Sequence, residues 1–259
     1  MFEGAIFDVD GVLVESPHER AWRETLERLL AGEWADIAAQ TSFRPGAFTT
    51  GVYMTLVSGK PRLAGATAAL EHLGVPGVDR RAREYADLKQ QQIVELIQAG
   101  EFEAFPDALR FILDVRDSGV RVAAASSSKN AGMFLERIRL DEFARSEGRV
   151  WGCVTDGMTL LDIFEADVCG RDFAHGKPDP EIFVTAAREL GVDTDAAFVI
   201  EDAVSGIQAA KGGRMAGLGI ARLDDEDLLA RAGADLVVTS LDAVSRPALA
   251  EGRLARAAG

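Results

Sequence analysis

The sequence predicts an α/β protein with a Rossmann-like parallel sheet as its core and an inserted α-helical domain. Three observations predict this fold. Short apolar runs alternate with helix-length amphipathic stretches, the runs are apolar almost throughout, and residues 17–100 break the alternation. Nearly continuous apolar runs indicate strands buried on both faces, which is typical of parallel sheets. A chain of 259 residues can form one large domain with an insertion, given about 100 to 200 residues per domain.

The predicted strands and helices follow one another along the chain. The strands are Ala5–Phe7, Val120–Ala125, Ala166–Val168, Ala197–Ile200, Ala216–Ala221 and Asp235–Val238. The helices around them are Pro106–Ser118, Lys129–Arg139, Pro180–Leu190, Val204–Lys211 and Asp225–Ala232. Because open parallel sheets bind ligands beyond the carboxyl ends of their strands, functional side chains are expected there.

The inserted segment reads as helical, with expected helices at Glu19–Leu30, Gly65–Leu73 and Arg80–Gln98. We expect a catalytic core of residues 1–16 and 103–259 and a helical cap of residues 17–102, with hinges near Ser16 and Phe102. The Ala- and Arg-rich tail 251–259 is expected to be frayed.

The composition excludes several classes of protein. The formal net charge of −14 disfavours nucleic acid and anionic membranes as partners, since both need a surplus of Lys and Arg. The two cysteines cannot form a disulfide framework and suit a reducing compartment. The first residues lack a basic and apolar leader, and no apolar run approaches the roughly eighteen residues of a membrane span. We therefore expect a soluble, cytoplasmic protein, either a monomer or a weak homo-oligomer.

The first predicted strand ends in Asp8, Asp10 and Gly11. Strand alternation would put both carboxylates on one side, and the glycine allows a sharp exit from the strand. Two such carboxylates repel each other unless a cation lies between them. Considered alone, a D-x-D pair is more often a helix cap or a solvated turn.

Three further polar clusters follow predicted strands. Ser126 begins a run of hydroxyls that could bind an anion or simply cap a helix. Lys177 lies between His175 and two stiffening prolines, and Glu201 and Asp202 end another strand. Each has an ordinary structural explanation, but all four would meet at one edge of the sheet. The carboxylates could bind a hard divalent ion, most naturally Mg²⁺, with Ser126 and Lys177 on phosphate oxygens, as phosphoryl transfer requires.

With these four motifs in order, the sequence resembles the haloacid dehalogenase (HAD) superfamily of phosphotransferases. It most resembles the group of beta-phosphoglucomutases and related sugar phosphatases. That closer likeness rests on the run Ser126–Asn130, on His18 followed by Arg20-Ala21-Trp22, on Gly59-Lys60-Pro61-Arg62, and on Gly206–Ala210 after the acidic pair.

The resemblance implies a role for each matching residue. Asp8 would be the nucleophile and Asp10 the general acid and base, while Ser126 and Lys177 would bind the transferring phosphoryl group. Asp8, Asp10, Glu201 and Asp202 would hold Mg²⁺. The substrate-binding residues would be His18, Gly59, Lys60, Arg62, Lys89, Ser128, Lys129 and Asn130, with Arg62 on a second phosphate. Lys89 matches less securely, because its polar run favours a solvated helix face, and His72 and His175 show no metal-ligand spacing.

Several functions stay open at this point. The segment Phe143–Leu161 is longer than the connection expected from the compact mutases, and we expect it to reshape the mouth of the site. A mutase and a sugar-phosphate phosphatase differ only in whether a sugar hydroxyl or water accepts the phosphoryl group, and Arg62 favours the mutase. A glycosyltransferase with a D-x-D motif leaves Lys177, Glu201 and Asp202 without a role. A non-catalytic phosphosugar-binding regulator would use the same residues without turnover.

Overall fold

The structure is a computed structural model that describes residues 1–58 and 60–257, and these form two compact units. The sheet unit comprises Met1–Glu15 and Glu103–Gly259, and the helical unit comprises Ser16–Phe102. The predicted border placed Ser16 with the sheet. Among the described residues, no helix is both long and apolar enough to cross a membrane.

The sheet unit is built on a parallel sheet whose order, in the described chain, is β5-β4-β1-β6-β7-β8. The strands are β1 (Gly4–Phe7), β4 (Arg121–Ala124), β5 (Ala166–Asp167), β6 (Ala197–Glu201), β7 (Ala216–Ile220) and β8 (Leu236–Val238). The chain builds outward from β1 first through β4 and β5, then on the other side through β6, β7 and β8. The carboxyl end of β1 is therefore the switch point where such folds bind ligands. The predicted α/β, Rossmann-like fold is confirmed.

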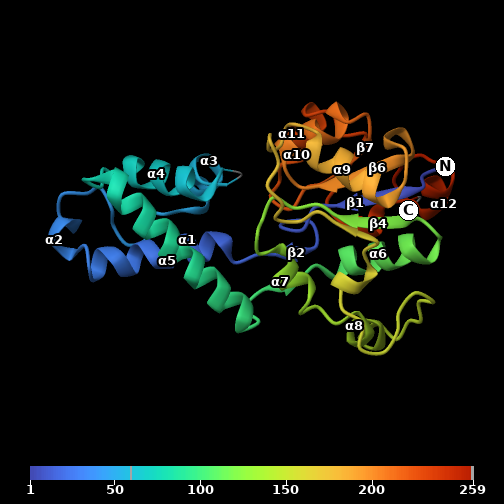
Figure 1. Ribbon diagram of the computed structural model, residues 1–259, viewed down its shortest axis with the longest axis horizontal. Coiled ribbons are helices and arrows are strands. Elements are labelled where there is room, and N and C mark those ends of the chain that lie inside the picture. The colour runs from blue at the N-terminus through green and yellow to red at the C-terminus, as the bar shows by residue number, and fades with distance from the viewer. Residues whose placement is uncertain (59, 258–259) are drawn as a thin grey trace. The chain divides into compact units, whose positions relative to one another are not determined.

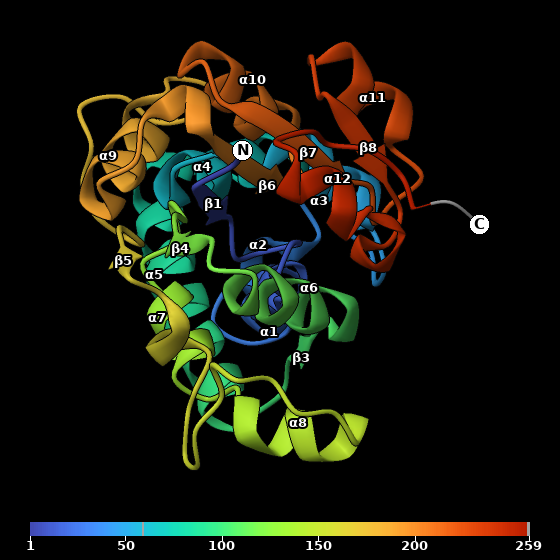
Figure 2. The same ribbon diagram turned by 90° about the vertical axis from the view of Figure 1, so that its right-hand side faces the viewer.

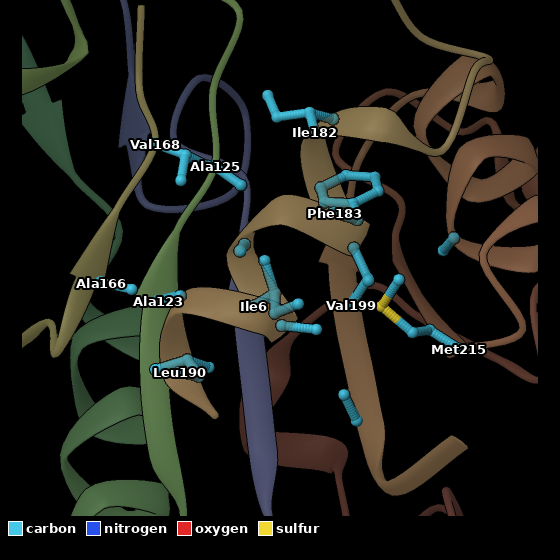
Figure 3. Packing of buried hydrophobic residues seen from close by; sticks show 14 of the residues in the cluster. Ile6, Ala123, Ala125, Ala166, Val168, Ile182, Phe183, Leu190, Val199 and Met215 are labelled. Atoms are coloured by element: carbon cyan, nitrogen blue, oxygen red, sulfur yellow. The ribbon is translucent and has the colours of Figure 1, made fainter. Parts of the chain in front are cut away.

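Helices cover both faces of this sheet, which is why its strands are apolar throughout. The helices are α6 (Pro106–Asp117), α9 (Glu181–Leu190), α10 (Val204–Gly212), α11 (Glu226–Arg231) and α12 (Arg246–Ala250). On one face, Ile6 and Val199 pack with α9 and α10 around Phe183 (Figure 3). On the other face, Phe7 and Phe198 contact Phe111 of α6. Figure 2 shows α9 and α10 on one side of the sheet and α6 on the other.

Some local predictions for the sheet unit were wrong. The helix expected at Lys129–Arg139 is only α7 (Ala131–Leu135). A helix that the sequence did not predict, α8 (Leu140–Glu147), overlaps the start of the segment Phe143–Leu161, and Arg139 and Arg145 stabilise it by binding the buried Asp141. The tail is not frayed up to residue 257, because Arg256 pairs with Val244 and Ala257 donates to Ala243.

Short elements that the sequence did not predict complete the sheet unit. A two-stranded antiparallel ribbon is formed by β2 (Val14–Glu15) and β3 (Glu103–Ala104), where the chain leaves and re-enters the sheet unit. Within the described part of this unit, single-turn 3-10 helices lie at η1 (Leu161–Ile163), η2 (Thr194–Ala196) and η3 (Leu241–Ala243).

The helical unit contains α1 (His18–Ala31), α2 (Ala35–Ala38), α3 (Thr50–Leu56), α4 (Arg62–His72) and α5 (Val78–Gln98). The long α5 packs against α1 and α4 (Figure 1). At the α1–α5 contact, the rings of Trp22 and Tyr85 meet edge to face at 4.9 Å, and the Tyr85 hydroxyl donates to the Trp22 carbonyl over 2.7 Å. This unit therefore has its own buried core.

Candidate active site

The turn after β1 carries the first two carboxylates. Asp8 is buried and its N–H donates to the Ile200 carbonyl over 3.1 Å, which continues the pairing with β6. Because the strand ends at Phe7, Asp8 and Asp10 lie in the turn and not on one strand face. Gly11 has a φ of +82°, and a Cβ at this position would lie 1.9 Å from Asp202 Oδ2. Glycine is therefore required here both for the backbone conformation and for the approach of Asp202.

Lys177 contacts both the carboxylate that follows β1 and the carboxylate that ends β6. Its Nζ donates to Asp8 Oδ1 over 2.6 Å and to Glu201 Oε1 over 2.5 Å. The exposed fraction of these side chains is only 11% for Lys177, 8% for Asp8 and 1% for Glu201, so this contact excludes most solvent. Lys177 Nζ also lies 4.8 Å from the centre of the Phe183 ring.

Glu201 is held on several sides. Its Oε2 accepts from the Ala203 N–H over 2.9 Å while Oε1 is bound by Lys177. A Cβ on Gly206 would lie 1.9 Å from the Glu201 carboxylate, so only glycine allows α10 to begin so close to it. The carboxylate therefore fixes Lys177, and its proposed role as a metal ligand stays a prediction.

The ionisation of this cluster is strongly perturbed. Burial, together with Glu201 and Asp10, raises the pKa of Asp8 to about 7 even though Lys177 acts in the opposite direction. Burial and the neighbouring carboxylates Glu201 and Asp8 also raise the pKa of Asp202 well above its usual value. Burial opposes the charge on Lys177, but Asp8 and Glu201 outweigh it and raise the pKa of the ammonium. Lys177 thus stays charged and alone does not balance its acidic neighbours.

This imbalance fits a bound divalent cation. The turn after β1 and the end of β6 bring four carboxylates to one strand edge, where Lys177 is the ammonium that contacts two of them. Carboxylate and carbonyl oxygens are the ligands that Mg²⁺ prefers. Asp202, which lies against Gly11 beside Asp10, is placed to share a cation with Asp8. The residues present therefore fit the cation that the sequence suggests.

The loop after β4 supplies a hydroxyl to the same edge. Ser126 is buried, its Oγ lies 3.5 Å from Asp10 Oδ2, and it accepts from the Ser128 N–H over 3.1 Å. Ser128 Oγ in turn accepts from the N–H of Asn130, whose side chain is buried. The serine run thus orders its own loop and brings Ser126 to Asp10.

Lys129 points away from this buried loop into solvent. Its Nζ forms an ion pair with Asp172 Oδ1 at 2.8 Å. Asp172 was not singled out in the sequence, and neither was Phe183 under Lys177. Neither has a spacing pattern that links it to its partner, so only the fold identifies them.

The other predicted binding residues belong to the helical unit. Lys89 is buried, which contradicts the solvated helix face expected for its polar run, and its Nζ lies 2.7 Å from His18 Nδ1 and 5.0 Å from the centre of the Trp22 ring. Arg62 begins α4 and is exposed, with its guanidinium 3.9 Å from Asp87. Lys60 is exposed as well, and Gly59 lies outside the described residues.

His175 has neighbours that its sequence spacing did not predict. Ligand atoms of His175, Asp179 and Glu181 lie within 4.8 Å of one another. Backbone bonds account for both carboxylates, because Glu181 accepts from the His175 N–H and Asp179 accepts from the Glu181 N–H. We interpret the role of this group as structural, because these hydrogen bonds order the loop that carries Lys177.

Comparisons with known proteins identify the family. A family model described as haloacid dehalogenase-like hydrolase matches residues 2–213. The chain belongs to this family. It is thus an enzyme of the HAD superfamily, as the order of its four motifs indicates.

Relatives in the HAD superfamily cover nearly the whole chain. A beta-phosphoglucomutase from Mycobacterium bovis is 32% identical, over 91% of this chain and 88% of the relative. A validoxylamine A 7'-phosphate phosphatase from Streptomyces hygroscopicus subsp. limoneus is 27% identical, over 95% of this chain and 98% of the relative. Among solved structures, an archaeal beta-phosphoglucomutase from Pyrococcus matches with a TM-score of 0.70 and 30% identity, over 96% of this chain and 97% of that one.

Proposed function

We propose that this enzyme catalyses Mg²⁺-dependent phosphoryl transfer on a small sugar phosphate, with Asp8 as the nucleophile. One observation carries the proposal: Asp8 is held by Lys177 at the switch point of the sheet, among three further carboxylates that call for a cation. Bound Mg²⁺ would neutralise charge on the transferring phosphate. Asp8, Asp10 and Asp202 would hold it, and Glu201 is a fourth candidate ligand.

We infer the steps of the reaction from the roles that the family resemblance gives to these side chains. An Asp8 carboxylate oxygen attacks phosphorus and the bond to the ester oxygen breaks, while Asp10 gives its proton to that leaving oxygen. Lys177 and Ser126 donate to the phosphoryl oxygens. In the second half-reaction Asp10 takes a proton from the incoming hydroxyl, whose oxygen attacks phosphorus and releases Asp8.

We further propose that the helical unit is a cap that selects the substrate. Arg62 begins α4 with an exposed guanidinium that suits bidentate binding of a second phosphate. Lys60, Lys89 and His18 would bind the rest of the sugar phosphate together with Ser128, Lys129 and Asn130 from the sheet unit. A residue that binds a second phosphate favours a mutase, because its bisphosphate intermediate must be held at both ends.

Two relatives support the two candidate reactions. The mycobacterial beta-phosphoglucomutase supports conversion of beta-glucose 1-phosphate to glucose 6-phosphate. The match to a phosphatase over 95% of this chain supports hydrolysis of a sugar phosphate as the second candidate. We place the mutase first because of Arg62.

One assay separates the candidates. The enzyme is incubated with Mg²⁺, beta-glucose 1-phosphate and a trace of glucose 1,6-bisphosphate, and glucose 6-phosphate and free phosphate are followed together. Glucose 6-phosphate without phosphate release supports the mutase, and phosphate release supports the phosphatase. Asp8→Asn should abolish either activity, whereas Asp162→Asn, at an exposed residue that bonds Thr159, should retain it. If neither product forms, the proposed substrate class is wrong.

A further inference from the structure

An arginine outside the four motifs reaches the turn that carries Asp10. Arg222 follows β7, and its guanidinium lies 3.4 Å from both the Gly11 and the Val12 carbonyl oxygens. These carbonyls belong to a tight turn in which the Gly11 N–H donates to the Val14 carbonyl, and the N–H groups of Leu13 and Val14 donate to the Val9 carbonyl.

The same guanidinium is fixed from its other side. Arg222 binds Asp107 of α6 in bidentate fashion, at 3.0 and 3.1 Å, and its carbon Cζ lies 3.9 Å from the centre of the Phe105 ring. Asp107 is itself buried and accepts from the Leu241 N–H over 2.8 Å. A buried, bidentate pair of this kind has one geometry, so it sets the position of the guanidinium.

Charge and burial make this arrangement selective for arginine. The Arg222 side chain is only 17% exposed, so its donors need partners within the protein. Its planar fork provides donors for two carboxylate oxygens and two carbonyl oxygens at once, which lysine cannot do. The pKa of Asp107 is lowered by the hydrogen bonds from Arg222 and from the Leu241 N–H. These bonds outweigh burial, which acts to raise it.

The contacts of Arg222 also mark where the chain crosses between units. Val12 lies two residues before β2, Phe105 directly follows β3, and the Phe105 N–H donates to the Leu13 carbonyl over 3.0 Å. The guanidinium therefore links the turn, the ribbon and the start of α6. On its other side the turn meets Asp202, whose carboxylate occupies the space beside Gly11. The backbone from Asp10 to Val12 is thus held between Asp202 and Arg222.

We propose that Arg222 is a positioning residue that, with Asp107, holds the 9–14 turn so that Asp10 stays within reach of the leaving oxygen. This inference rests on the proposed function for the acid and base role of Asp10. Arg222 touches no substrate atom, and its effect passes through the backbone of the turn. A side chain displaced by about 1 Å can cost on the order of 100-fold in rate.

The test compares Arg222→Met with Arg110→Met. Arg110 lies on α6 with a similar exposed fraction, 24%, and also forms a bidentate pair, but with Asp242, and it bonds Glu147 and not the turn. Two readouts are taken. Hydrogen exchange reports the amides of Gly11, Leu13 and Val14. The first kinetic measurement is the first-turnover burst of p-nitrophenolate from p-nitrophenyl phosphate, whose leaving group needs no general acid. The second is turnover of beta-glucose 1-phosphate with a trace of glucose 1,6-bisphosphate, whose leaving oxygen must be protonated.

For Arg222→Met we expect exchange of these three amides to rise about tenfold or more, since bonds to a charged group are lost. Sugar-phosphate turnover should fall about 10- to 100-fold more than the burst rate. Arg222→Lys, which keeps the charge but not the fork, should fall between the wild type and Arg222→Met. Arg110→Met should change neither readout.

Several results would overturn the inference. They are unchanged exchange in the turn, exchange raised equally by Arg110→Met, and equal losses of burst and sugar turnover in Arg222→Met. A wild-type protein without Asp8-dependent activity would instead overturn the proposed function, and the exchange of the turn would then decide alone whether Arg222 holds it.

Discussion

Asp10 is the residue whose replacement should separate the two halves of the proposed reaction. Asp10→Asn keeps the size of the side chain and its place beside Ser126 but cannot give or take a proton. We expect Asp8 still to be phosphorylated by p-nitrophenyl phosphate, whose leaving group needs no acid. Turnover of sugar phosphates should fall about 10²- to 10⁴-fold, the usual contribution of a general acid or base.

Rapid acid quenching with detection of hydroxylamine-sensitive phosphate on the protein, combined with steady-state sugar turnover, checks this prediction. Asp162→Asn serves as the control for the substitution itself. Equal losses on both substrates would remove Asp10 from its assigned role.

At the scale of elements, the turn between β1 and β2 depends on one glycine. Gly11→Ala would place a Cβ 1.9 Å from Asp202 Oδ2 in a backbone with φ of +82°, so either the turn or Asp202 must move. We expect loss of most activity along with stability. Gly119→Ala is the matched control, since Gly119 has a φ of +88° and, within the described part of the chain, its Cβ would meet no atom within 4 Å. It should cost about 1 to 2 kcal/mol and leave activity intact.

Thermal melting and the Asp8-dependent assay together distinguish the two glycine variants. If both variants lost stability equally and kept activity, the contact of Gly11 with Asp202 would have no catalytic importance.

The α1–α5 contact predicts how the helical unit responds to alkali. Burial raises the pKa of Tyr85 well above its usual value of 10.0, because the phenol must stay neutral in the fold. Its contribution to stability is complete below pH 10 and is lost above it, since the unfolded chain then releases the proton. Tyr85→Phe removes the bond to the Trp22 carbonyl and should cost about 1 to 2 kcal/mol at pH 7. It should also reduce the loss of stability between about pH 9 and pH 11.

Urea unfolding at several pH values, followed by circular dichroism and tryptophan fluorescence, measures both effects. Tyr53→Phe, at the half-buried tyrosine of α3, is the control and should show a smaller cost at neutral pH. A Tyr85→Phe protein as sensitive to alkali as the wild type would contradict the prediction.

Elements that follow a local pattern could be predicted, and those that depend on distant partners could not. The strands of the described sheet were predicted because strands buried on both faces give nearly continuous apolar runs, as in Ala197–Ile200. The strands β2 and β3 have only two residues each, which is too short to show an alternation of apolar and polar side chains. Likewise α8 was not predicted, and Arg139 and Arg145 bind Asp141 in its first turn.

The same distinction applies to the candidate site. Motifs at strand ends place Asp8, Ser126, Lys177 and Glu201 at one edge because all parallel strands share a direction. Arg222 and Asp107 are 115 positions apart, and their pairing follows from the order of β1, β6 and β7, which local sequence does not encode. The burial of Lys89 against Trp22 was not predicted for the same reason, since the three residues that follow it in sequence are all glutamine.

For the molecule as a whole, the excess of 42 acidic over 28 basic residues would give the proposed cation two roles. An enzyme with a net charge of −14 must attract an anionic substrate, and it must also fold with four carboxylates gathered beside one lysine. A bound divalent ion serves both, because it lowers the repulsion within the folded state and makes this edge of the sheet attractive to phosphate.

Mg²⁺ should therefore stabilise the whole protein. A ligand that binds only the folded state adds about 2.7 kcal/mol at 100 times its dissociation constant, which corresponds to a rise of several degrees in Tm. Melting curves with Mg²⁺, with EDTA, and with NaCl at equal ionic strength measure this effect. Asp202→Asn should lose most of the rise and Asp162→Asn should keep it. A rise produced equally by NaCl would mean that general screening of the acidic surface stabilises the protein, and the carboxylate cluster would then need no specific cation.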